Sequence, residues 1–213
     1  MTDSKSHPEK WRQIVAETIY YYDRLPERSA EREAFFRLEF EQIRKKFGTT
    51  YQEIIAHLSQ KDSYDACQAL LTAISWKIYQ HEPMTPIELG LMGVYGLNTE
   101  VNNGGFHQYF FNSAGDDWPF VLWMLEEAQD KPGFQRFKQV LSIFPGGHPA
   151  TIRKQRWRQL EELEKWPWRS WLSERHFDKH SKSYYAEQYP KNELFWRLVK
   201  ERLPLVEFQL PGL

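Results

Sequence analysis

The chain of 213 residues has a single cysteine, Cys67, so no disulfide can form within it. A chain without disulfides suits a reducing compartment, and we expect a cytoplasmic protein. No segment approaches the roughly 18 consecutive apolar residues of a membrane-spanning helix. Residues 1–10 lack the apolar core of a secretory signal, and we expect no membrane partner.

Positive charge is missing from residues 78–130, although the whole chain has a net charge of only −1. This segment, the acidic block, carries eight carboxylates and a net charge of −8, whereas residues 131–213 carry +7. The asymmetry has two interpretations. Either the acidic block packs against the basic C-terminal part and is neutralised internally, or it faces outward and attracts a cationic partner.

Helix signals dominate the sequence. Ser29, Thr50 with Glu53, and Thr85 before Pro86 have the composition of helix starts, and apolar residues recur at helical spacing between them. Strand-like patterning is confined to residues 205–210, which would form a short strand or an extended tail.

This pattern predicts an all-α fold, because strands do not alternate with helices as they do in Rossmann and barrel folds. We expect one compact domain over residues 1–213. Residues 1–60 would supply accessory N-terminal helices, and residues 65–200 would form the core.

Residues 102–105, Asn-Asn-Gly-Gly, interrupt a helix between two apolar stretches. Glycine permits positive φ angles and asparagine tolerates them, so the chain can turn sharply here. In one interpretation the asparagines bond to unpaired backbone groups of a tight corner, and the aromatic residues that follow are core. In the other, the corner is a recognition surface, because amide side chains both donate and accept hydrogen bonds. The residues that we assign to this surface are Glu100, Asn102, Asn103, Gly104, Gly105, Phe106, Gln108, Tyr109, Asn112, Ser113, Asp116 and Asp117.

The run EVNNGGFHQYFFNS at residues 100–113 resembles the signature of the bacterial DNA-mimic protein family, most of whose members have no assigned function. The similarity continues in FPGGHP at residues 144–149. The resemblance implies a helical fold, a homodimer and a protein-binding role. The behaviour that names the family is to present an acidic surface to a DNA-binding protein in place of DNA, whose phosphates supply most of the attraction.

Other patterns in the sequence suggest other kinds of site. His107, Glu100, Asn103 and Asn112 could line a small-ligand or catalytic pocket at the corner. The basic and aromatic runs RKQRWR at residues 153–158 and KWPWRSW at residues 165–171 could bind single-stranded nucleic acid. His176 and His180 have zinc-ligand spacing but no third ligand nearby, so we expect no metal site and no cofactor.

The sequence therefore favours a non-enzymatic regulatory or inhibitory protein. Its partner would be a basic or DNA-binding protein that meets the acidic block, and direct nucleic-acid binding is the less favoured alternative.

Overall fold

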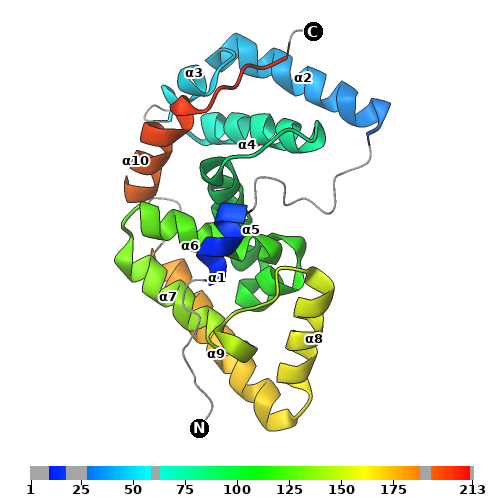
Figure 1. The fold of residues 1–213 in the computed structure, drawn as a ribbon, viewed down its shortest axis with the longest axis vertical. Helices are drawn as coiled ribbons and strands as arrows, with labels where there is room; N and C mark the ends of the chain where they lie inside the picture. The colour runs from blue at the N-terminus through cyan, green and yellow to red at the C-terminus, as the bar shows by residue number, and fades with distance from the viewer. Residues whose placement is uncertain (1–9, 18–27, 59–62, 188–192, 212–213) are drawn as a thin grey trace. The chain divides into compact units, whose positions relative to one another are not determined.

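The computed structural model describes residues 10–17, 28–58, 63–187 and 193–211 (Figure 1). The predicted all-α fold is confirmed, because these residues form helices and no strand. Residues 205–210, the candidate strand, leave a 3-10 turn at Leu203–Leu205 and continue as an extended tail. The tail makes one isolated antiparallel bridge, between Thr50 and Gln209.

The chain divides into two compact units, one from residues 1–17 and 89–196 and one from residues 18–88 and 197–213. A single domain over residues 1–213 therefore stays a prediction. In the part of the chain that the structure describes, every helix is too short or too polar to cross a bilayer.

The unit of residues 18–88 and 197–213 begins with three helices whose ends follow local sequence signals. They are α2 (Ala30–Phe47), α3 (Tyr51–Ile55) and α4 (Ser63–Tyr79). The Ser29 side chain caps α2 by accepting a hydrogen bond from the Arg32 amide, as predicted. Thr50 and Glu53 form the predicted capping box of α3. The interior of this unit is aromatic, with Phe36, Phe40, Trp76 and Tyr79 in mutual ring contact.

Glu88, at the start of α5 (Pro86–Phe111), is a fully buried carboxylate in this unit. Its Oε1 lies 2.6 Å from the Lys77 ammonium and accepts a hydrogen bond from the Tyr51 hydroxyl at 2.8 Å. Its Oε2 accepts hydrogen bonds from the amide and hydroxyl of Thr85. Both oxygens are occupied, so this member of the acidic block serves the interior of the unit.

The unit of residues 1–17 and 89–196 contains most of the remaining helices. They are α1 (Lys10–Glu17), α6 (Trp118–Glu127), α7 (Lys131–Leu141), α8 (Arg153–Glu164), α9 (Pro167–Glu187), the part of α5 from Leu89 onward and the start of α10 (Glu193–Arg202). Apolar residues at helical spacing predict a helix over residues 8–23, and the parts of this range outside 10–17 lie outside the described residues. The sequence pattern predicts a helix over residues 168–177, and α9 contains this range and extends ten residues beyond it.

Within this unit α6 packs against α1 and α7, and α9 packs against α7 and α8 (Figure 1). The centre is a cluster of buried aromatic side chains: Phe106, Tyr109, Phe110, Phe137, Phe144 and Phe177. The signature segment therefore supplies the core of this unit as well as part of its surface.

Candidate binding surface at the kink in α5

Helix α5 is kinked at Gly104 and Gly105, where the sequence predicted a break. Gly105 has a φ of +76°, in the left-handed region that favours glycine. A Cβ atom at this position would lie 2.8 Å from Ser181 Oγ. The same hydroxyl accepts a hydrogen bond of 3.0 Å from the Phe106 amide, so a serine of α9 holds the first residue beyond the kink.

Glu100 connects the two sides of the kink. Its Oε2 accepts hydrogen bonds from Gln108 Nε2 at 2.7 Å and from Asn112 Nδ2 at 2.8 Å. All three side chains are half-buried, and both amides donate to the same carboxylate oxygen. Glu100, Gln108 and Asn112 therefore fix the angle of the corner, although one oxygen of Glu100 keeps its capacity to accept.

Arg156 anchors the C-terminal end of α5 to the start of α8. Its side chain is fully buried, and its five N–H groups reach five oxygens, those of Phe110, Asn112, Ala150, Thr151 and Asp116. The bond from Nη2 to Asp116 Oδ1 measures 2.5 Å and is an ion pair. Arg156 was predicted as part of a basic surface run, whereas the structure uses it as an internal anchor.

Two titratable groups of the corner are shifted by burial, those of the half-buried Asp117 and the fully buried Tyr109. Burial, followed by repulsion from Asp116, raises the pKa of the Asp117 carboxyl to about 7, and Arg156 partly opposes the shift. Burial also raises the pKa of the Tyr109 hydroxyl. Asp117 stands at the N-cap position of α6, where the sequence pattern places a cap, but its side chain makes no capping hydrogen bond.

The exposed residues of the signature form what we call the corner surface. They are Asn102, Asn103, Gly104, His107, Phe111 and Ser113. Phe106 and Tyr109 of the predicted site are buried, and so is Gly105. Those three therefore support the surface from within.

Asn102 and Asn103 differ from the other amides of the signature. Both side chains are exposed, and neither makes a hydrogen bond to any described residue. The interpretation in which these asparagine side chains bond to unpaired backbone groups of a tight corner is therefore not supported. Two amides with free donors and acceptors therefore lie at the bend.

Aromatic rings continue the corner surface onto α8. Phe111, 49 % exposed, stacks on Trp157 at 5.3 Å and accepts a hydrogen bond of 2.6 Å from the Trp157 indole through its carbonyl. His107 stacks on Phe111, and its Nε2 lies 2.7 Å from Glu164 Oε1. The sequence did not predict the contact between Phe111 and Trp157, since it joins residues 46 positions apart.

Part of the acidic block is neutralised by the chain itself. Besides Glu88 with Lys77 and Asp116 with Arg156, Glu126 lies 2.5 Å from Arg12 of α1. The Asp130 carboxylate caps α7 by accepting a hydrogen bond from the Gly133 amide. The block does not form one continuous unpaired acidic surface.

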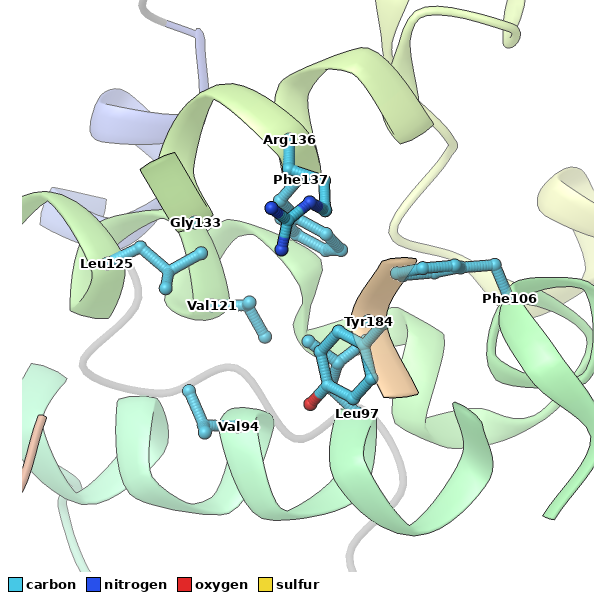
Figure 2. Close-up of a pocket in the computed structure, with 9 residues that line it drawn as sticks. All are labelled: Val94, Leu97, Phe106, Val121, Leu125, Gly133, Arg136, Phe137 and Tyr184. Atoms are coloured by element: carbon cyan, nitrogen blue, oxygen red, sulfur yellow. The ribbon is translucent and has the colours of Figure 1, made fainter. Parts of the chain in front are cut away.

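A small pocket lies behind the kink (Figure 2). Its free volume of about 20 Å³ is the space of roughly one water molecule. The side chains around it are almost all apolar: Val94, Leu97, Phe106, Val121, Leu125, Phe137 and Tyr184, with Arg136 at one side. The four side chains of the catalytic hypothesis are not among the lining residues (Figure 2). They are Glu100, Asn103, His107 and Asn112. Among the described residues no three His, Cys, Asp or Glu side chains are grouped to hold a metal ion.

The chain matches the family model described as DMP19-like protein over residues 82–202. Neither a curated protein nor a solved structure matches the chain. The family match contains the whole corner, from Glu100 to Asp117, and more than half of the chain. It confirms the resemblance to the DNA-mimic family: the chain belongs to the family of DMP19-like proteins.

Proposed function

We propose that this chain is a non-enzymatic regulatory protein that binds a protein partner through the corner surface. The observation that carries the proposal is the pair of exposed amides, Asn102 and Asn103, which have no hydrogen-bond partner among the described residues. Free amides and the exposed ring of Phe111 in one segment combine hydrogen bonding with apolar contact, as protein interfaces do.

The partner class that we propose is a DNA-binding protein, in keeping with the DNA-mimic role of the family. Such proteins read base edges with donors and acceptors, which an asparagine amide can imitate. Charge has a minor part in this proposal. Residues 82–202 carry 16 basic and 16 acidic side chains, and several of the carboxylates are paired internally.

The amides can be tested by affinity capture from the native cell. The full-length wild type is compared with a variant carrying Asn102→Ala and Asn103→Ala. Both positions are exposed, so we expect an unchanged circular dichroism spectrum. The control removes two exposed amides elsewhere, Gln52→Ala on α3 and Gln135→Ala on α7. We expect a partner that the wild type and the control retain and that the asparagine variant loses. Equal retention by all three proteins would refute the role of the corner.

Two measurements on the captured partner test its class. We expect duplex DNA to compete with the chain for the partner, because the proposed mimicry requires one shared site. We also expect the affinity to change little with salt, since few unpaired charges are available to release counterions. A steep loss of affinity at high salt would instead assign binding to an acidic surface.

The homodimer implied by the family resemblance is part of the proposal. Light scattering on the purified chain measures its mass in solution, and a monomer at working concentration would remove dimerisation from the proposed mechanism.

A further inference from the structure

The pair Asn103–Gly104, at the bend of α5, has the features of a chemically labile site. It is the only place in the chain where glycine follows asparagine. The Asn103 side chain is exposed and makes no hydrogen bond to a described residue, so nothing among these residues holds its amide in place. Asparagine amides are among the thermally labile groups of proteins, and a following glycine has no Cβ to obstruct attack on the amide.

The backbone at this pair can reach the geometry that such an attack requires. Asn103 is the last residue before the kink, because Gly104, with φ −155° and ψ 22°, and Gly105, with φ +76°, lie outside the helical region. The attack requires the ψ angle of Asn103 to leave its helical value, which opens the last turn before the kink. Helix ends open more easily than helix interiors, and two successive glycines permit the rotation. Asn103 is therefore more reactive than an asparagine inside a regular helix.

The other asparagines that the structure describes are less reactive. Asn112 is followed by a serine, but its Nδ2 donates to Glu100 Oε2 at 2.8 Å and its side chain is half-buried. Asn98 is buried and accepts a hydrogen bond through Oδ1. Asn102 is exposed, but the residue after it carries a side chain that hinders the approach of the backbone nitrogen. Among the described residues, an exposed and unbonded amide before a glycine occurs only at Asn103.

We propose that Asn103 is a self-modification site, at which the folded chain converts the asparagine into aspartate and isoaspartate without an enzyme. The backbone nitrogen of Gly104 attacks Cγ of Asn103 and closes a succinimide ring. The bond from Cγ to Nδ2 breaks, and the amide group leaves as ammonia with the proton of the attacking nitrogen. Water then opens the ring. Cleavage of the new bond gives aspartate, and cleavage of the original peptide bond gives isoaspartate, so the net reaction consumes water and releases ammonia.

Both products change the corner surface. Each places a carboxylate where Asn103 carries a neutral amide, and isoaspartate also adds a methylene group to the main chain before Gly104. The new charge follows Glu100 by three positions, and like charges at this spacing destabilise a helix. The proposed function depends on the amides at the bend. Modification would therefore limit the time for which a chain can bind its partner, and this consequence rests on the proposed function.

Peptide mass spectrometry of the folded full-length chain tests the modification. It requires no partner, so its result is separate from that of the proposed function. The chain is incubated in water enriched in oxygen-18 and then digested, and fragment ions locate any change. We expect Asn103 to gain the mass of an amide-to-acid exchange with one heavy oxygen, which marks conversion during the incubation. An isoaspartate methyltransferase should label the same peptide, and Asn98 and Asn112 should stay unchanged over the same time.

Two variants frame this measurement. Asn103→Gln should abolish the conversion, because the longer side chain closes its ring far more slowly. Gly146→Asn is the positive control, since it creates a second asparagine–glycine pair at an exposed position with open space around it. The positive φ of Gly146 is one that asparagine tolerates. The new pair should convert under the same conditions, and circular dichroism checks that both variants are folded.

An unchanged Asn103 in the folded wild type, while the pair created by Gly146→Asn converts, would overturn the proposal, because the helix would then block the attack. Conversion that is equally fast at Asn112 would overturn it as well. Where a partner is captured, the bound chain should contain less of the modified form than the unbound chain. Equal shares would refute the consequence for binding, whereas the mass measurement decides the modification itself.

Discussion

Tyr109 places a hydroxyl in the interior of the corner without a hydrogen-bond partner among the described residues. A buried hydroxyl that makes no bond costs about 1–3 kcal/mol of stability. We therefore expect Tyr109→Phe to leave the free energy of unfolding unchanged or to raise it by about 1 kcal/mol in urea denaturation. Tyr184→Phe is the matched control, because the Tyr184 hydroxyl donates to Asn98 Oδ1 at 2.9 Å. That control should be destabilised, and equal effects at both positions would show that Tyr109 is bonded.

Asp117 should make stability fall as pH rises. The pKa of its carboxyl is about 7 in the folded protein, against an ordinary value of 3.8, because the half-buried side chain is desolvated and is repelled by Asp116. Between these two values the folded state keeps a proton that the unfolded state releases, so the free energy of unfolding decreases with rising pH and the loss is complete above the folded pKa.

Substitution of Asp117 by asparagine removes this pH dependence. Relative to the wild type, Asp117→Asn should gain about 2 kcal/mol between pH about 5 and pH about 8, a discounted value since the side chain keeps some contact with solvent. Urea denaturation at both pH values measures the gain. Asp178→Asn, at an exposed position of α9, is the control and should show no gain. A constant difference between Asp117→Asn and the wild type would contradict the raised pKa.

At the scale of the element, the kink in α5 can be tested by a single substitution at Gly105. Gly105→Ala places a Cβ in the left-handed region and 2.8 Å from Ser181 Oγ, so we expect a loss of about 2–3 kcal/mol in the free energy of unfolding. Gly146 has a nearly identical φ of +77° with open space around it. Gly146→Ala should therefore cost only about 1 kcal/mol, which is the backbone part alone. Adding Ser181→Ala to Gly105→Ala should recover some of the loss, and no recovery would mean that the close contact is absent.

Local signals in the sequence predicted the elements well. The cap at Ser29, the capping box of Thr50 with Glu53 and the break before Phe106 each depend on neighbours within a few residues, and each is confirmed. The contacts that fix the corner are of another kind. Ser181 reaches Phe106 across 75 positions, and no pattern in a single sequence encodes such a pairing.

The site residues show the same division between local and distant information. Exposure of Asn102 and burial of Tyr109 follow from the face of α5 that meets α9, which helical spacing alone does not identify. Arg156 belongs to the basic run RKQRWR, but the structure buries its side chain. Its partners are three oxygens between Phe110 and Asp116 and the carbonyls of Ala150 and Thr151, just before α8. Counting charges along the sequence therefore overestimates the unpaired surface charge of the acidic block and of the basic run at residues 153–158.

For the whole molecule, the internal ion pairs predict how stability responds to salt. An unpaired acidic surface repels itself, and added salt would screen the repulsion and raise the melting temperature. Here Glu88, Asp116 and Glu126 are paired with Lys77, Arg156 and Arg12. We expect the melting temperature to stay level or to fall slightly as sodium chloride rises from about 0.05 M to about 0.5 M, because the Debye length then shortens to a few ångströms.

A charge-reversal variant supplies the comparison for this salt titration. Lys131→Glu on α7 and Lys154→Glu on α8 replace exposed basic residues and so create the excess of negative charge that the wild type lacks. That variant should gain stability as salt is added, which calibrates the size of the effect in this fold. If the wild type gained as much as the variant, its carboxylates would be repelling one another in solution. Partner binding would then have to be explained by an acidic field and no longer by the amides at the bend.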